Sequence, residues 1–202
     1  MSVVVDVLLA AGGVAIGRWL AQRLRAARPG EPGPSNAGAP APRDVLAGAP
    51  CRLGDVLVRT TERDEAWLAG ALVFREQRPV AALFVAPEAV ADRAVFAREG
   101  DAGVTWLTAL GEGELSVQGE PPHALEHAGV RFERVRRLPV RVEQAGTGAP
   151  NVGDRAVVAE YAGPGAERIV VVSGSEQARA WVGRALRRED FDVLPGSTNR
   201  GD

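Results

Sequence analysis

Lysine is absent from this chain of 202 residues, so all 24 basic residues are arginines. A Schiff-base lysine and a P-loop lysine are therefore excluded, and with them the enzyme classes that depend on either group. The exclusive use of arginine, with abundant alanine, glycine and valine, is typical of a GC-rich bacterial coding sequence. Cys51 is the only cysteine. It cannot form an intramolecular disulfide, a redox dithiol or a cysteine-based zinc site, which agrees with a reducing compartment.

Excess positive charge is also lacking, because 24 basic residues stand against 26 acidic ones and the net charge is −2. Residues 1–50 contain 5 arginines and 3 acids, a charge of +2, which leaves −4 for residues 51–202. A domain with this charge is not a general nucleic-acid binder, so no nucleic-acid partner is expected.

A long apolar run opens the sequence. Residues 3–21 are almost all Val, Leu, Ala, Gly and Ile, and arginines follow at positions 23, 25 and 28. A helix of this length measures about 28 Å, close to the roughly 30 Å hydrocarbon core of a bilayer. Residues 1–28 are therefore predicted to be a hydrophobic anchor helix with a basic flank, which contacts membrane lipid through residues 3–21. Because the arginines follow the run, we expect a single-pass protein of a bacterial inner membrane with its C-terminal domain in the cytoplasm.

Two alternatives remain open for this segment. Arg18 and Arg25 share a helical face, as in an amphipathic helix that lies on the membrane. A cleaved secretory signal carries its positive charge before the apolar run, whereas here Asp6 stands there. Gly13 and Gly17 form a GxxxG pair, which favours weak homo-association of the helix unless the spacing is an accident of composition.

Composition divides the rest of the chain into three parts. Residues 29–50 are rich in Pro, Gly and Ala without any aromatic residue, which predicts an extended linker. Residues 51–196 contain enough Val, Leu, Ala and aromatic residues to bury one core and form a domain. Residues 197–202 are predicted to be a flexible tail.

The domain is predicted to be mainly β, an antiparallel barrel or sandwich, because short β-branched and aromatic runs alternate with Gly and Pro. The predicted strands cover 56–60, 66–75, 80–85, 104–110, 130–135, a stretch around 140–142, 155–161 and 167–173. Residues 87–99 and 177–186 are compatible with either helix or strand.

The clearest predicted hairpin turns at Gly163-Pro164-Gly165. Residues 169–172 are four consecutive apolar β-formers, so this strand should be buried on both faces, opposite residues 156–159. Gly54-Asp55 and Gly153-Asp154 each precede a strand, a turn and a second apolar strand, which suggests two similar β units.

The C-terminal half resembles the bacterial family called domain of unknown function forty-one seventy-eight. The residues that carry the resemblance lie at 129–132 (GVRF), 153–154 (GD), 160–165 (EYAGPG), 182–183 (VG) and 193–196 (VLPG). The match is best over 129–196 and extends over 51–196. It implies a β-rich domain tethered behind an N-terminal hydrophobic helix, and it supplies no catalytic residues.

His123-Ala-Leu-Glu-His127 fits the H-x-x-E-H pattern of inverted zinc peptidases. That chemistry needs both imidazoles on one face of a stable helix. Pro121 and Pro122 precede the run and Gly129 follows it, which leaves room for only about two helical turns. The histidines are therefore predicted to lie in a turn. No catalytic, cofactor-binding or metal-binding residue is assigned, and no cofactor is expected.

A basic cluster is the remaining candidate for a binding surface. It consists of Arg131, Arg134, Arg136, Arg137 and Arg141, offset by Glu133. Such a face either meets anionic lipid or an acidic partner, or is solvated and paired with neighbouring acids. We therefore expect a membrane-tethered, non-catalytic β-rich adaptor or interaction domain with a protein partner of unknown identity. The alternative is an enzyme with an unrecognised site, at best a zinc-dependent hydrolase that uses residues 123–127.

Overall fold

The computed structural model describes residues 44–62, 64–87, 92–111, 113–115, 117, 119–175 and 177–196. The anchor helix predicted at 3–21, its Gly13 and Gly17 pair, most of the linker and the tail lie outside these residues. Within them, no helix is long and apolar enough to cross a membrane.

Twelve strands make up nearly all of the regular structure of the described residues, which confirms a mainly β domain. They are β1 Val56–Arg59, β2 Glu65–Trp67, β3 Gly70–Arg75, β4 Pro79–Ala86, β5 Arg93–Arg98, β6 Val104–Ala109, β7 Ala124–His127, β8 Val130–Gly146, β9 Arg155–Ala162, β10 Glu167–Gly174, β11 Ala178–Leu186 and β12 Phe191–Leu194. A 3-10 turn, Arg188–Asp190, precedes β12. Both ambiguous segments contain strands, β5 and β11, and the two runs predicted near 130 and 140 belong to one strand, β8.

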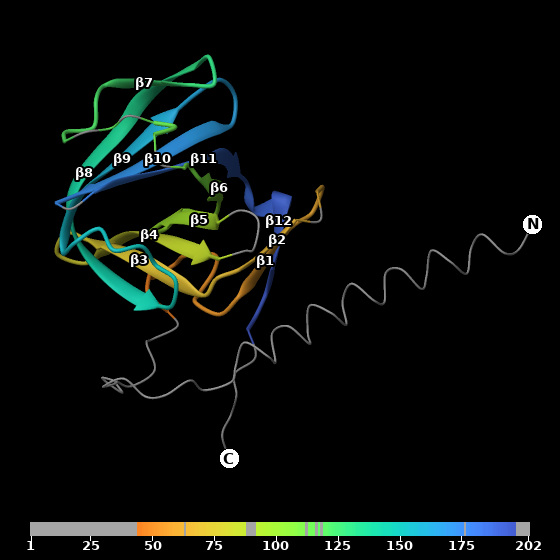
Figure 1. Cartoon of the computed structure of the whole chain (residues 1–202). Coiled ribbons are helices and arrows are strands. Elements are labelled where there is room, and N and C mark those ends of the chain that lie inside the picture. The colour runs from red at the N-terminus through yellow and green to blue at the C-terminus, as the bar shows by residue number, and fades with distance from the viewer. Residues whose placement is uncertain are drawn as a thin grey trace, which may run out of the picture. The chain divides into compact units, whose positions relative to one another are not determined.

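The strands close into a barrel rather than forming an open sandwich (Figure 1). β3 to β6 form one antiparallel meander, here the first meander, and β8 to β11 form the second meander. Pairing of β6 with β11 joins the meanders on one side, and pairing of β3 with β8 closes the barrel on the other.

Two glycines face each other where β3 and β8 meet. Gly70 is paired with Gly146, which has a φ of 70°. A Cβ atom on Gly70 would stand 2.2 Å from the carbonyl oxygen of Thr147, and one on Gly146 would stand 2.3 Å from that of Ala69. The backbones therefore approach at this crossing more closely than any side chain would allow.

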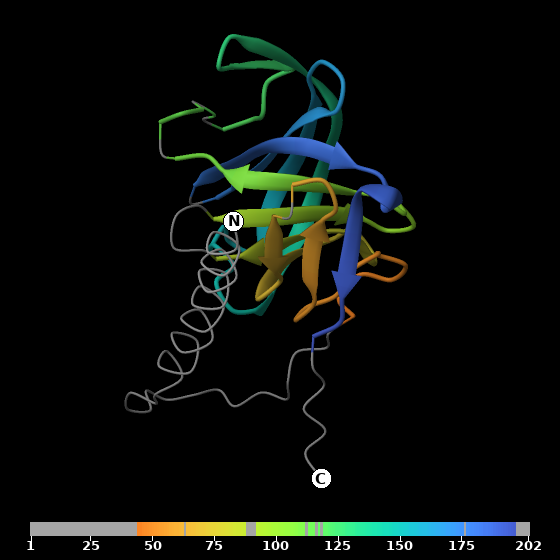
Figure 2. The same cartoon turned by 90° about the vertical axis from the view of Figure 1, so that its right-hand side faces the viewer.

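A small sheet of three strands, in the order β12-β1-β2, covers the outer face of the first meander (Figure 2). Leu57 of β1 and Phe191 of β12 are buried there against Phe84 and Val95 of the barrel. Leu46 is also buried in this cluster, although the sequence places it in the linker. Burial of Leu46 shows that the packed domain begins before Cys51.

The barrel interior and the outer face of the second meander form two further cores. Large interior residues include Leu72, Phe74, Leu83 and Phe96. The outer core of the second meander contains Leu125 and Phe132 from the β7–β8 hairpin, Ala159 and Tyr161 from β9, and Ile169 and Val171 from β10. Because β9 and β10 contribute side chains to both of these cores, each has apolar residues on both faces.

The β9–β10 hairpin is confirmed, but its register differs from the prediction. Gly163 donates its N–H to the carbonyl of Glu167, which closes a short connection. Residues 169–172 are buried, and they pair with 158–161 instead of 156–159. The shift of two residues arises because the ladder already begins with Ala162 opposite Arg168, directly beside the turn.

The Gly-Asp echo does not mark equivalent strands. Gly54 and Gly153 both have positive φ, 86° and 83°, and each precedes a strand. Asp55, however, is buried and leads into β1 of the small sheet, whereas Asp154 is exposed and leads into β9 of the barrel. The similar units in the topology are instead the two meanders, which differ in their boundaries from those suggested by the sequence.

Candidate functional site

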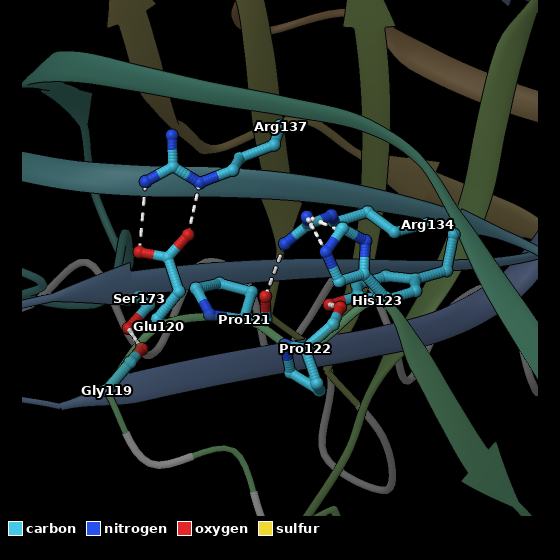
Figure 3. Close-up of polar contacts among 9 residues, drawn as sticks. Gly119, Glu120, Pro121, Pro122, His123, Arg134, Arg137 and Ser173 are labelled. Carbon is cyan, nitrogen blue, oxygen red and sulfur yellow. Dashed lines mark hydrogen bonds and ion pairs between the residues drawn. The ribbon is translucent and has the colours of Figure 1, made fainter.

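The structure divides the predicted basic cluster of β8. Arg131 lies 3.7 Å from Glu133, and Arg136 lies 3.6 Å from Glu160. Two other members, Arg134 and Arg137, are engaged by a segment that we call the strap, residues 119–123 (Figure 3). Only Arg141 of the original five has neither an acidic nor a backbone partner within the described part of the chain.

Polar contacts from three strands of the second meander hold the strap. From β8, Arg134 donates a hydrogen bond to the backbone carbonyl of Pro121. From β9, the hydroxyl of Tyr161 donates to the carbonyl of Pro122 at 2.8 Å. From β10, the hydroxyl of Ser173 donates to the carbonyl of Gly119 at 2.8 Å. Arg137 forms a two-point ion pair with Glu120, with one contact of 2.9 Å. Hydrogen bonding from Arg137 lowers the pKa of Glu120. These arginines hold the strap in place, so they are not a free binding surface.

The two histidines that the sequence placed in a turn lie at the end of the strap and in the hairpin that follows it. His127 ends β7 and pairs with Val130, and His123 immediately precedes β7. The turn lies instead at Ala128 and Gly129, which both have positive φ, 50° and 75°, as a two-residue hairpin connection of type I′ requires.

This extended geometry does not build the H-x-x-E-H arrangement. His123 and His127 are four positions apart along an extended segment, which corresponds to about 13 Å, and Glu126 lies on the opposite face from His127. A ring nitrogen of His123 lies 3.1 Å from Arg134, which can only donate, so that nitrogen is occupied as an acceptor. Among the described residues, no group of three or more His, Cys, Asp or Glu side chains is placed to hold a metal ion.

Cys51 is likewise unsuited to nucleophilic chemistry. Its side chain is buried in the core beneath the small sheet. Burial, with a smaller contribution from the charge of Asp55, raises the pKa of Cys51 to about 12. The thiol is therefore protonated and shielded at neutral pH.

The feature with the clearest capacity for binding is an arginine row that crosses three neighbouring strands. Register sets Arg75 of β3 opposite Arg141 of β8, and Arg141 opposite Arg155 of β9. Residues in directly opposite positions share a sheet face, with Cβ atoms about 5 Å apart. The adjacent Val142 and Ala156 face the interior core, so the arginine side chains lie on the outer wall.

Charge in the arginine row is only partly compensated. Arg75 forms an ion pair of 2.8 Å with Glu143. Arg141 and Arg155 are exposed, and neither has an acidic partner among the residues that the structure describes. Like charges directly opposite each other destabilise a sheet pair. An anionic group placed between Arg141 and Arg155 would remove that repulsion.

A shallow groove that is wide open to solvent lies beside the arginine row. Besides the three arginines, its walls include Glu76, Pro139, Val140, Ala156, Val157, Ser173, Gly174 and Ser175. Pro139 and Val157 are paired across β8 and β9 and give the floor an apolar character. The arrangement combines an apolar strip with uncompensated positive charge at one side.

Sequence reasoning identified Arg141 but missed Arg75 and Arg155. These two lie about 66 and 14 positions away from it in the chain, and only the register of β3, β8 and β9 brings all three together. The sequence does place Arg75 at the end of one predicted strand and Arg155 at the start of another, and this was the one local sign of their position.

Comparison of the chain with family models, with curated proteins and with solved structures finds no significant match. The resemblance to the domain of unknown function forty-one seventy-eight thus remains a prediction from the residues that carry it.

Proposed function

We propose that this chain is a membrane-tethered, non-catalytic interaction domain whose barrel binds an acidic segment of a partner protein. The observation that carries the proposal is the arginine row, in which Arg141 and Arg155 face each other without an acidic partner among the described residues. The apolar run at 3–21 would provide the membrane anchor, and the linker would let the barrel reach its partner.

Charge favours an acidic polypeptide over an anionic membrane surface as the occupant of the groove. The net charge of the chain is −2 and that of residues 1–50 is +2, so residues 51–202 have a net charge of −4. A negatively charged bilayer therefore repels the domain as a whole. A short acidic segment meets only the local positive charge. The apolar floor of the groove suits side chains of such a segment better than a hydrated headgroup.

Side-chain contacts, and not strand addition, are expected to dominate this binding. Between the residues paired with β7 and those paired with β3, the one strand paired with β8 among the described residues is β9, so β8 presents a short edge there. Pro139 lies in that interval and has no N–H to offer a further strand. The edge is therefore protected, and specificity falls to the arginine row.

Binding of a fluorescein-labelled peptide of alternating glutamate and valine to the full chain in nanodiscs tests the proposal. We expect the Arg141→Gln/Arg155→Gln double variant to bind at least tenfold more weakly, without a lower melting temperature, because repulsion across the pair is removed. The matched control is Arg131→Gln/Arg184→Gln, two exposed arginines away from the groove, with less than a twofold effect. Equal losses in both variants, no binding by the parent, or row-dependent binding to phosphatidylserine vesicles in place of the peptide would overturn the proposal.

Alkaline carbonate extraction tests the tether separately. The full chain should stay with the membrane fraction, because residues 3–21 provide the only apolar run of spanning length. Release by carbonate would contradict a spanning anchor and favour the interfacial helix.

A further inference from the structure

One mouth of the barrel contains a small cavity with charged walls. Its volume is about 190 Å³, and it is partly open to solvent. The residues that define its polarity are Arg98, Asp101, Thr105, Glu160 and Arg168. Barrel mouths are common places for small ligands, because the strand ends supply polar groups above an apolar interior.

Strand register turns Glu160 and Arg168 toward this mouth. Glu160 of β9 is directly opposite Val170 of β10, an interior core residue, and therefore shares its face. Arg168 lies two residues before Val170, on the same face. The backbone positions of Glu160 and Arg168 are thus diagonal neighbours, about 7 to 8 Å apart.

The carboxylate of Glu160 is buried without full compensation. Its side chain is 13% exposed, and its Oε1 atom has no hydrogen-bond partner among the residues that the structure describes. Arg136 and Arg98 lie 3.6 and 3.9 Å from its oxygens, beyond hydrogen-bond length, and Arg98 is also paired with Asp101. A buried acceptor in this state gains from a donor that enters the cavity.

Arg168 provides the complementary group. One of its terminal nitrogens donates to the carbonyls of Gly165 and Glu167, which fixes the side chain. No acidic side chain of the described residues lies within ion-pair distance of its guanidinium, although Arg168 is close enough to Glu160 to lower the pKa of that carboxyl. A carboxylate could therefore bind to its remaining N–H groups.

We propose that this mouth binds a small zwitterion of the α-amino-acid class, with its ammonium group on Glu160 and its carboxylate on Arg168. A simple anion would leave Oε1 of Glu160 without a donor, and a simple cation would leave the remaining N–H groups of Arg168 without an acceptor. A ligand that carries both charges a few ångströms apart satisfies both groups at once. The volume of the cavity suits a ligand of this size.

The electrostatic surroundings are consistent with this ligand. Burial is the largest influence on Glu160 and raises its pKa, and the negative charge of Asp101 raises it further. The positive charges of Arg98, Arg136 and Arg168 lower the pKa and offset part of this rise. An ammonium group against Oε1 would stabilise the ionised carboxylate that burial disfavours.

Isothermal titration calorimetry of the full chain in nanodiscs with L-alanine tests the proposal. N-acetyl-L-alanine, which lacks the ammonium group, and L-alaninamide, which lacks the carboxylate, should each bind at least tenfold more weakly than L-alanine. Glu160→Gln should weaken L-alanine binding at least tenfold, whereas Glu167→Gln, next to Arg168 on the opposite face of β10, should leave it unchanged. Arg168→Gln should lose affinity for L-alanine but not for L-alaninamide.

Three results would overturn this assignment: no heat of binding with L-alanine, equal binding of N-acetyl-L-alanine, or equal binding of L-alaninamide. Thermal melts show whether each variant is folded before it is titrated. The Arg141→Gln/Arg155→Gln double variant should keep L-alanine binding, because the arginine row lies on the outer wall. The site in the mouth and the proposed function can therefore fail independently.

Discussion

The two meanders of the barrel differ in how their outer faces are covered. The first meander is covered by the small sheet, through apolar contacts of buried side chains such as Leu57 and Phe191. The second is covered by the β7–β8 hairpin and by the strap, which is held by hydrogen bonds from Arg134, Tyr161 and Ser173. The small sheet adds a further hydrophobic layer to the first meander. The strap, by contrast, is a polypeptide segment that polar groups hold against the second meander.

This difference locates the surfaces that are available for binding. Strands β3 to β5 of the first meander are buried over most of their length, although Arg75 of this meander belongs to the arginine row and Arg98 lines the charged mouth. The second meander carries the other charged groups that the two proposals use, Arg141, Arg155, Glu160 and Arg168. We infer that the first meander mainly stabilises the domain and that the second presents most of its chemistry.

The largest expected effect is on the outer core of the second meander. Val171 is completely buried there, so Val171→Asp places an unpaired carboxylate in an apolar site and should unfold a domain whose net stability is about 5 to 15 kcal/mol. Arg184→Ser, at an exposed position of β11, is the control and should melt within a few degrees of the parent. A Val171→Asp protein with the parent's melting curve would show that the strap does not cover a true core.

The next effect compares the two covers directly. Phe191→Ala removes a buried ring from the small sheet and should cost about 3 to 5 kcal/mol. Tyr161→Phe removes only the hydrogen bond to Pro122 of the strap and should cost about 1 to 2 kcal/mol. Urea denaturation of both variants gives the two values, and a larger loss for Tyr161→Phe would reverse the proposed difference between the covers.

A pH-dependent effect is expected from Glu160. Its pKa is raised above the ordinary value of 4.5, mainly by burial, so the folded state binds this proton more tightly than the unfolded state. The associated stability is fully present below the unfolded pKa and is lost as the pH rises through the folded value. The Glu160→Gln variant has no carboxyl group to ionise and does not lose this stability. The melting temperature of the variant minus that of the parent should therefore increase from pH 4 to pH 7.

The control for this pH series is Glu133→Gln, at an exposed position of β8. A melting-temperature difference for Glu160→Gln that stays flat with pH, or grows toward acid, would contradict the burial of an ionised carboxylate. Asp55 is also a buried acid, but its carboxylate accepts hydrogen bonds from the backbone N–H groups of Arg52 and Gly196, whereas Oε1 of Glu160 accepts none from the described residues.

The smallest effect concerns the turn of the β7–β8 hairpin. Ala128 adopts a φ of 50°, in the left-handed region that asparagine tolerates better than alanine. Ala128→Asn should therefore stabilise the domain by about 1 kcal/mol, which chemical denaturation can resolve. The same exchange at Ala166, between the turn residue Gly165 and β10, is the control, because its φ is not positive. Destabilisation by Ala128→Asn would indicate that the hairpin turn is of another type.

Local sequence patterns predicted the strands well because β-branched runs bounded by Gly and Pro depend on nearby residues. The β9–β10 hairpin was predicted for the same reason. The predicted register of that hairpin was wrong by two residues. Alternation of apolar and polar residues normally fixes the register of a strand, and β10 has apolar residues on both faces. Closure of the barrel could not be predicted either, because Gly70 and Gly146 are far apart in the chain.

The candidate site was less accessible from the sequence. Five arginines close together on β8 suggested one basic face, but four of them have partners on the strap, on β9 or on β8 itself. The arginine row depends on cross-strand register, and the charged mouth depends on which face of β9 Glu160 occupies. Both are properties of the tertiary structure.

The pairing of β1 with β12 has a consequence for synthesis of the chain. Val56 pairs with Leu194, so the first strand of the domain receives its neighbour on that side only when nearly the whole domain has left the ribosome. At about 5 to 20 residues per second, that interval lasts roughly 7 to 28 s. During it, the apolar side of β1 has no complete sheet to join, and the nascent domain depends on chaperones or on rapid closure of the barrel to avoid aggregation.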